Sequence, residues 1–233
     1  FSFSKRFQEG IYRIGMAEKP SLVLDVEGAS MQSGANVQLY SWNRSTAQMF
    51  LVTYASEGAY AIIPLCSGNV LDLSAASPYD GANVQQYVWN GTAAQRWFIQ
   101  ENADGSFAII SASSGKYLDV ANGELAAGAN VQTWQGNDTD AQRFDFVPLS
   151  TLKTIASGLD SSLVLDISGG STESGANVQL YKRNGTKAQM FHVSDLTSEG
   201  RRFIIPALGA HMSLDAVSGG YQDGANVWQY QIN

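Results

Sequence analysis

The stretch Gly34-Ala35-Asn36-Val37 decides how this chain folds, because the same four residues return four more times. The later copies begin at Gly81, Gly128, Gly175 and Gly224, in steps of 47, 47, 47 and 49 residues. Self-similarity at a fixed period of this length is typical of repeat architectures, in which one supersecondary unit recurs. We therefore interpret the 233 residues as five copies of one unit.

Four other positions keep the same spacing in every copy that reaches them. An aspartate preceded by leucine lies nine positions before the motif. Counted from this aspartate, an aromatic residue follows by 15 positions, an asparagine by 18 and a glutamine by 23. The aspartates are Asp25, Asp72, Asp119, Asp166 and Asp215, and the aromatic residues are Tyr40, Tyr87, Trp134, Tyr181 and Tyr230. The asparagines are Asn43, Asn90, Asn137, Asn184 and Asn233, and the glutamines are Gln48, Gln95, Gln142 and Gln189. Chance does not hold such a register, so these side chains are the candidate site residues.

Each copy has the alternation of a half-buried β-strand. Leu22, Leu24 and Val26 alternate with their neighbours, and so do Val37 and Leu39. Glycine-containing clusters separate these runs, as expected for turns that need a positive φ. No window keeps an apolar stripe at helical spacing. The sequence predicts an all-β fold with about four strands per copy and almost no helix.

A longer period is superimposed on the first. Residues 21–50 match residues 162–191 at 20 of 30 positions, and Ile62-Ile63-Pro64 of the second copy returns as Ile204-Ile205-Pro206 in the fifth. A unit of three copies has therefore been duplicated. Pro148 lies at the join, and proline cannot donate to a continuing central strand. We predict a complete domain over residues 1–148 with copies one to three, and a partial domain over residues 149–233 with copies four and five.

A tripeptide at the end of each copy carries a family resemblance. Gln95-Arg96-Trp97 has the pattern Gln-x-Trp, and phenylalanine replaces the tryptophan in Gln48-Met49-Phe50, Gln142-Arg143-Phe144 and Gln189-Met190-Phe191. Together with the register, this resembles the ricin B-chain family of β-trefoil lectins over essentially the whole chain. The resemblance implies one complete β-trefoil built from four-stranded repeats of about 47 residues, followed by a truncated second one.

The resemblance also implies one shallow sugar pocket per repeat. In the third repeat Asp119 would accept hydrogen bonds from sugar hydroxyls, Trp134 would stack on the sugar, Asn137 would reach a hydroxyl and Gln142 would orient the aspartate. A carboxylate makes strong hydrogen bonds with hydroxyls, and a flat ring matches the C–H face of a pyranose. The equivalent residues of the other repeats are the remaining candidate sugar-binding residues.

Each candidate has a structural alternative. The aspartates could accept backbone hydrogen bonds at a hairpin, and the glutamines are better explained as buried amides that bind several backbone groups. The asparagines at 43, 90, 137 and 184 stand in Asn-x-Ser/Thr sequences, which would be glycan acceptors in a eukaryotic secreted protein. Turn formation is the interpretation we favour for them.

Composition and motifs argue against several other functions. Charged residues are 15%, the formal charge is −7, and the basic residues are scattered, which disfavours nucleic acid and anionic membranes as partners. No segment is long and apolar enough to insert in a membrane. Cys66 is the only cysteine, and His192 and His211 lie in no metal-binding or catalytic motif. We therefore predict no metal, no cofactor and no enzymatic activity within these residues.

The sequence thus predicts a carbohydrate-binding, lectin-like module with several weak repeated pockets and glycans as partners. We expect it to be an appendage of a secreted or cell-surface protein, with any catalytic domain outside these residues. The alternative is a sugar-inactive β-trefoil that mediates protein–protein interaction, because the family often has asparagine before the glutamine where this chain has Ala47, Ala94, Ala141 and Ala188. For the second domain we expect a neighbouring segment, strand exchange or a sixth copy to cover the open sheet edges.

Overall fold

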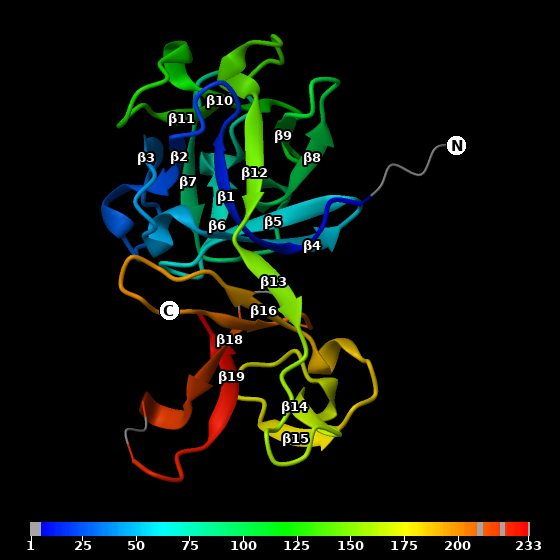
Figure 1. Ribbon diagram of the computed structural model, residues 1–233. Helices are drawn as coiled ribbons and strands as arrows, with labels where there is room; N and C mark the ends of the chain where they lie inside the picture. Colours follow the sequence, from blue (N-terminus) through cyan, green and yellow to red (C-terminus); the bar gives the residue numbers. More distant parts are fainter. Residues whose placement is uncertain (1–5, 209–211, 220–221, 233) are drawn as a thin grey trace. The chain divides into compact units, whose positions relative to one another are not determined.

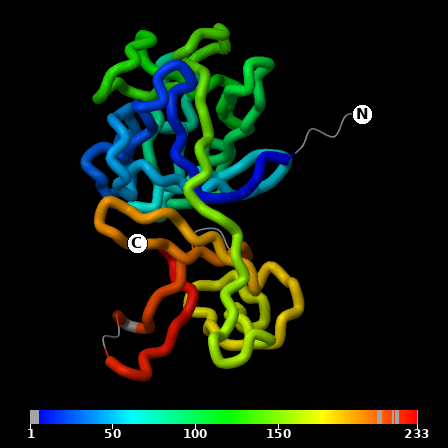
Figure 2. The backbone as a smooth tube through the Cα atoms, viewed as in Figure 1, coloured from blue at the N-terminus to red at the C-terminus, as the bar shows by residue number. Residues whose placement is uncertain are grey.

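The computed structural model describes residues 6–208, 212–219 and 222–232. The chain divides into two compact units, the first ending at Leu149 and the second beginning at Ser150. Figure 2 traces the backbone from the blue and green first unit into the yellow and red second one. Across the described ranges the elements are strands and single turns of 3-10 helix, without an α-helix, which confirms the all-β prediction.

Twelve strands form the first unit (Figure 1). They are β1 (Gly10–Met16), β2 (Leu22–Val26), β3 (Val37–Ser41), β4 (Phe50–Ser56), β5 (Ala59–Pro64), β6 (Val70–Leu73), β7 (Ala82–Tyr87), β8 (Trp97–Glu101), β9 (Phe107–Ser111), β10 (Tyr117–Val120), β11 (Val131–Trp134) and β12 (Phe144–Pro148). The 3-10 turns are η1 (Glu27–Ala29), η2 (Thr46–Gln48), η3 (Ser74–Ala76), η4 (Ala93–Gln95), η5 (Ala121–Gly123) and η6 (Asp140–Gln142).

In the second unit the described strands form one three-stranded sheet and two hairpins. The sheet has the order β13 (Ser150–Lys153), β16 (Phe191–Ser194), β17 (Ile204–Pro206), and the hairpins are β14 (Leu163–Ile167) with β15 (Val178–Lys182) and β18 (Met212–Ala216) with β19 (Val227–Gln231). The 3-10 turns are η7 (Ser168–Gly170), η8 (Lys187–Gln189) and η9 (Val217–Gly219).

Six strands of the first unit close into a barrel. The antiparallel pairs run β1–β4, β4–β5, β5–β8, β8–β9, β9–β12 and back from β12 to β1. The other six form three hairpins, β2–β3, β6–β7 and β10–β11. Each repeat therefore supplies four strands, and the first unit is the predicted β-trefoil. Closure of the barrel leaves its strands without an open edge.

The aromatic residue of each Gln-x-aromatic tripeptide lies in the core. Phe50, Trp97 and Phe144 come one from each lobe and are fully buried in a single cluster. The indole Nε1 of Trp97 donates to the carbonyl oxygen of Leu71 at 3.0 Å, so its polar atom is satisfied. Phe191 is the buried equivalent in the second unit. These tripeptides thus supply the largest core side chains, which is the physical reason for their recurrence.

The asparagine of the Gly-Ala-Asn-Val motif joins the three lobes. Asn83 Nδ2 donates to Asn36 Oδ1 at 3.0 Å, Asn36 Nδ2 to Asn130 Oδ1 at 3.0 Å, and Asn130 Nδ2 to Asn83 Oδ1 at 2.9 Å. The three amides therefore form a closed ring, in which each donates once and accepts once. Backbone bonds surround it, for example from Leu39 N to Ala129 O at 2.8 Å.

Two of these asparagines meet in the second unit. Asn226 Nδ2 donates to Asn177 Oδ1 at 2.7 Å, which is the same bond as the one from Asn83 to Asn36. Among the described residues no third amide joins this pair. Leu180 is 50% exposed, whereas its equivalent in the first unit, Leu39, is fully buried. The second unit therefore has the hairpins of two lobes and an open asparagine pair.

The closed ring predicts a large cost for its interruption. In Asn83→Ala, Asn130 Nδ2 loses its acceptor and Asn36 Oδ1 loses its donor, and we expect the free energy of unfolding of the first unit to fall by about 1–3 kcal/mol. Urea denaturation followed by tryptophan fluorescence measures this. Asn226→Ala is the matched control, because it removes the same side chain from the open pair; an equal loss in the first unit from both variants would contradict the prediction.

Candidate functional site

The β10–β11 hairpin places the predicted aspartate and aromatic residue of the third repeat on one face. Asp119 is directly opposite Gln132, and Tyr117 is directly opposite Trp134. Directly opposed residues of an antiparallel pair share a face, and residues two apart on a strand share it too. Asp119 and Trp134 therefore project to the same side, as the fifteen-residue spacing requires.

The carboxylate of Asp119 is held by two amides. Gln132 Nε2 donates to Oδ1 at 2.9 Å, and Gln142 Nε2 donates to Oδ2 at 3.0 Å. Asp119 is 4% exposed, and this burial raises the pKa of its carboxyl above the ordinary value, although the hydrogen bonds from Gln132 and Gln142 oppose the rise. Each carboxylate oxygen keeps further acceptor capacity for a ligand.

Gln142 also holds the loop that precedes it. Its Oε1 accepts from the backbone N–H of Asn137 at 3.0 Å, and its Nε2 donates to the carbonyl oxygen of Gln135 at 3.0 Å. Within the loop, Asn137 Oδ1 accepts from the backbone N–H and the hydroxyl of Thr139. Asn137 therefore forms a turn through its oxygen, and its Nδ2 has no partner among the described residues.

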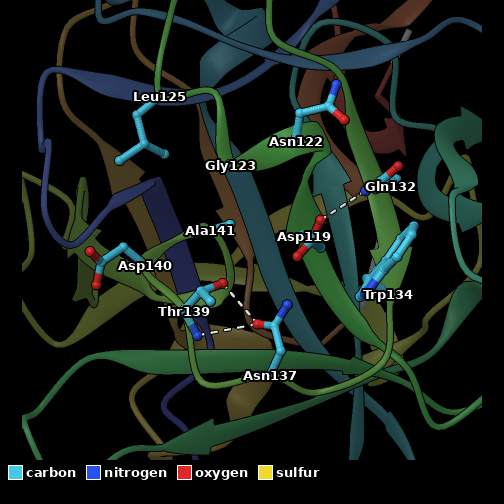
Figure 3. Close-up of a pocket in the computed structure, with 10 residues that line it drawn as sticks. All are labelled: Asp119, Asn122, Gly123, Leu125, Gln132, Trp134, Asn137, Thr139, Asp140 and Ala141. Carbon is cyan, nitrogen blue, oxygen red and sulfur yellow. Dashed lines mark hydrogen bonds between the residues drawn. The ribbon is translucent and has the colours of Figure 1, made fainter.

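Asp119, Trp134 and the loop that contains Asn137 line a cavity of about 530 Å³ (Figure 3). Asp119, Trp134 and Asn137 face the same space, and Asp140 lies across it from Trp134. Asn122 and Gly123 of η5 form another part of the wall. The indole of Trp134 is 39% exposed, so its ring remains available for stacking. A cavity of this size with a few convergent polar groups is typical of a small-molecule site.

The fourth repeat has a second cavity, of about 430 Å³. Asp166, Tyr181 and Asn184 line it in the same arrangement. Gln179 Nε2 donates to Asp166 Oδ1 at 3.0 Å, and Gln189 Nε2 donates to Asp166 Oδ2 at 3.1 Å. The carboxylate is thus held by two amides, as in the third repeat.

The first and second repeats repeat much of this geometry. Their aspartates are buried, and burial raises the pKa of both carboxyls. Their aromatic residues are exposed, their asparagines form the same turn through the side-chain oxygen, and their glutamines accept from the asparagine N–H at 2.7 Å. These residues are Asp25, Tyr40, Asn43 and Gln48 in the first repeat and Asp72, Tyr87, Asn90 and Gln95 in the second.

The predicted glutamines lie behind the pockets. Gln48, Gln95, Gln142 and Gln189 are all buried. Because their amides bind the loop backbone, and in the third and fourth repeats also the aspartate, they act on a ligand only by orienting other groups. That geometry agrees with the orienting role implied by the resemblance.

The fifth repeat differs from the others. Asp215 is exposed, and its Oδ2 accepts from the indole Nε1 of Trp228 at 3.2 Å. The ring of Trp228 stacks on Tyr230, with centroids 5.0 Å apart. Among the described residues, the carboxylate of Asp215 is therefore not held by two glutamine amides as those of Asp119 and Asp166 are. The fifth asparagine, Asn233, lies outside the described residues.

Sequence reasoning missed the second glutamine that holds each aspartate. It is the residue after Gly-Ala-Asn-Val, and its Nε2 donates to the aspartate Oδ1 at 2.9 to 3.1 Å. These glutamines are Gln38, Gln85, Gln132 and Gln179. The signal was present, because extending the motif by one residue finds glutamine in four copies and Trp228 in the fifth.

Three further observations concern the described residues. They contain no group of histidine, cysteine or acidic side chains arranged to hold a metal ion. Likewise, no helix found in them has the length and apolar character needed to cross a membrane. Burial raises the pKa of the Cys66 thiol to about 11, so it is protonated near neutral pH.

The sequence was compared with models of known protein families. The ricin-type β-trefoil lectin domain-like model matches residues 1–87, 46–134, 93–181 and 140–230, which together span almost the whole sequence. The chain belongs to this family. The resemblance drawn from the Gln-x-aromatic tripeptides is thereby confirmed. Domains of this lectin type are typically non-catalytic. A search of curated proteins returned no match.

Solved structures agree with the family. The designed threefold-symmetric protein ThreeFoil is 36% identical with a TM-score of 0.59, over 60% of this chain and 99% of ThreeFoil. The exo-β-1,3-galactanase 1,3Gal43A of Clostridium thermocellum is 27% identical with a TM-score of 0.58, over 60% of this chain and 30% of the galactanase. The Macrolepiota procera ricin B-like lectin, in complex with lactose, is 18% identical with a TM-score of 0.53, over 62% and 99%, a likeness of fold alone.

The buried carboxyl of Asp119 predicts an unusual titration. We expect Asp119 to titrate above the ordinary aspartate value, and Asp104 to titrate below it, because Ser106 donates to the Asp104 carboxylate. Carbonyl-detected NMR across pH 2 to about 7 measures both, with Asp104 as the internal control.

A folded-state pKa above the unfolded one adds stability that is lost as pH rises through it. Asp119→Asn should therefore gain stability relative to wild type as pH rises; a difference independent of pH would contradict the assignment.

Proposed function

We propose that this chain is a carbohydrate-binding module and that its pockets each hold one sugar unit of a glycan. The observation that carries the proposal is the third-repeat cavity, where an oriented carboxylate, an exposed indole and an asparagine amide face one space. Sugar hydroxyls would donate to the Asp119 carboxylate, and the Nδ2 of Asn137 would donate to a sugar oxygen. The C–H face of the sugar would lie on Trp134.

Membership in a lectin family supports the proposal. The solved structure of the Macrolepiota procera lectin contains lactose, and the galactanase acts on a galactan by its name. We propose that the pockets of this chain bind weakly one by one and act together through effective concentration. We further propose that the module is a non-catalytic appendage of a secreted or cell-surface protein. By binding a glycan, it would keep the rest of that protein close to the glycan.

One observation favours a second function. The residue before each buried glutamine is alanine, and Ala47, Ala94, Ala141 and Ala188 are all buried. This position therefore supplies no side-chain hydrogen bond to a sugar. A β-trefoil without sugar affinity could bind a protein partner on the same scaffold, because a fold does not fix a function. Screening the full chain on a glycan array separates the two proposals: if no glycan binds, the protein-binding function replaces the lectin function.

The stacking role of Trp134 gives the first direct test. In Trp134→Ala the sugar loses its apolar platform, and we expect the affinity of the third-repeat pocket to fall about tenfold. Isothermal titration with the best array ligand measures the loss. The melting temperature should change little, because the ring is largely outside the core.

Phe98→Ala is the matched control, since Phe98 has the same 39% exposure and lies on β8, away from the cavity. It should leave sugar affinity unchanged. If Trp134→Ala binds normally but melts well below wild type, the ring is structural and the stacking role is wrong.

The carboxylate role predicts a pH dependence of binding. Protonation of Asp119 turns a charged acceptor into a weaker neutral one, so affinity should fall as pH drops through its raised pKa. Titrations at constant ionic strength between neutral pH and the onset of unfolding measure this. In Asp119→Asn the carboxyl is gone, and the remaining affinity at that pocket should be low and independent of pH. A wild-type affinity that is constant over the same range would exclude the aspartate as the acceptor.

A further inference from the structure

The loop between the platform aromatic residue and the buried glutamine differs in charge among the repeats. In the third repeat it reads Gln135-Gly136-Asn137-Asp138-Thr139-Asp140, with two acids. In the fourth it reads Lys182-Arg183-Asn184-Gly185-Thr186-Lys187, with three bases. The two six-residue sequences align without a gap, and each has the turn-forming asparagine in its third position. The net charge of the loop is therefore opposite in the two repeats, and one aligned pair, Asp140 and Lys187, carries opposite charges.

One inverted position lies in the wall of both cavities. Asp140 is the first residue of η6 and lines the third-repeat cavity, and Lys187 is the first residue of η8 and lines the fourth-repeat cavity. Both side chains lie within the same frame of aspartate, aromatic ring and asparagine. The exchange of Asp140 for Lys187 therefore changes what a bound ligand meets without changing how the loop is held.

The surrounding charges reinforce this inversion. In the third repeat the described lining residues include two acids, Asp119 and Asp140, and no cation. Arg143 lies outside the lining and pairs with Asp138 at 2.8 Å, with Asp140 at 3.5 Å and with Asp104 at 3.6 Å. Lys19 Nζ donates to the carbonyl oxygen of the lining residue Leu125 at 3.0 Å. A cavity with more carboxylates than cations disfavours an anionic ligand.

In the fourth repeat the balance is different. Asp166 is the single acid lining the cavity, and Met190 replaces Arg143. Lys182, the last residue of β15, and Arg183 are exposed, but Lys182 projects to the face of the strand opposite to Tyr181. Among the described residues that line the cavity, one cation, Lys187, therefore accompanies one carboxylate, Asp166. This charge distribution suits a ligand that carries both hydroxyls and an anion.

We propose that the fourth-repeat cavity binds glycans that carry an anionic group, a carboxylate or a sulfate, whereas the third-repeat cavity takes neutral glycans. The inference rests on the proposed sugar-binding function and adds the class of sugar. Asp166, Tyr181 and Asn184 hold the ring as their equivalents do in the third repeat. Lys187 makes charge-assisted hydrogen bonds with the anion.

The expected selectivity is moderate. Exposed ion pairs contribute little individually and are screened by salt, so we expect the fourth-repeat cavity to prefer an anionic glycan over its neutral counterpart by about five- to tenfold at low ionic strength. The preference should shrink as salt is added, while stacking and neutral hydrogen bonds persist.

A paired glycan array on the full chain tests the proposal. Each neutral hexoside on the array is matched with its uronic acid and with its 6-sulfated derivative. Wild type should bind anionic members better than their neutral counterparts, and Lys187→Asp should lower that ratio at least fivefold. The reciprocal change Asp140→Lys should raise the ratio. Lys153→Asp alters the net charge equally at an exposed lysine on β13 and should leave the ratio unchanged.

The outcomes separate this inference from the function on which it rests. Binding of neutral glycans with no anionic preference, or a ratio that Lys187→Asp does not change, overturns the inference and leaves the lectin function standing. An equal effect of Lys153→Asp also overturns it, because net charge would then be the cause. Absence of binding to any glycan overturns both. A preference confined to uronic acids or to sulfates supports the proposal and identifies the anion.

Discussion

The ring of three asparagine amides is the constraint on which the first unit depends. Asn36, Asn83 and Asn130 each donate once and accept once, and this arrangement closes only when three lobes meet at one axis. Strand geometry then carries the constraint outward. Asn130 lies directly before β11, and Gln132 and Trp134 occupy alternate positions on that strand and share a face. The first closes the ring, the second holds Asp119, and the third forms the platform. The asparagine ring and the candidate pocket are thus joined by one short segment, residues 130–134.

This coupling explains why repetition in the sequence predicted so much. A period of 47 residues, strand alternation and the Gln-x-aromatic tripeptide were sufficient for the three-lobed fold, because each is a local pattern that the core uses directly. The asparagine ring was not predictable, since the sequence shows that Asn36 recurs but not which atoms it meets across lobes. The altered fifth site was also missed. Asp215 keeps its register, yet it is exposed, and Trp228 stands where the other repeats have the glutamine that follows the Gly-Ala-Asn-Val motif.

The aspartates have structural partners, but these are glutamine side chains and not the backbone groups expected at a hairpin. In the third repeat two amide donors, from Gln132 and Gln142, point at different oxygens of Asp119. An asparagine could accept only one of them, because its other terminal group is itself a donor. The carboxylate is therefore required by its protein neighbours. Burying it raises its pKa, which is a cost to stability at neutral pH, and both oxygens retain acceptor capacity toward the cavity.

The division between buried frame and exposed loop has a consequence for specificity. Residues such as Gln142 and Gln189 cannot change without leaving backbone groups unpaired, so the way in which a pocket holds its ligand is tied to the fold. Exposed positions such as Asp140 and Lys187 make no comparable contribution to stability, since surface substitutions usually alter it by about 0.5 kcal/mol or less. Duplication therefore repeats the buried hydrogen-bonding residues, while the charged residues on the exposed loops differ between repeats. Related pockets with different surrounding charges therefore need no change in the elements that support them.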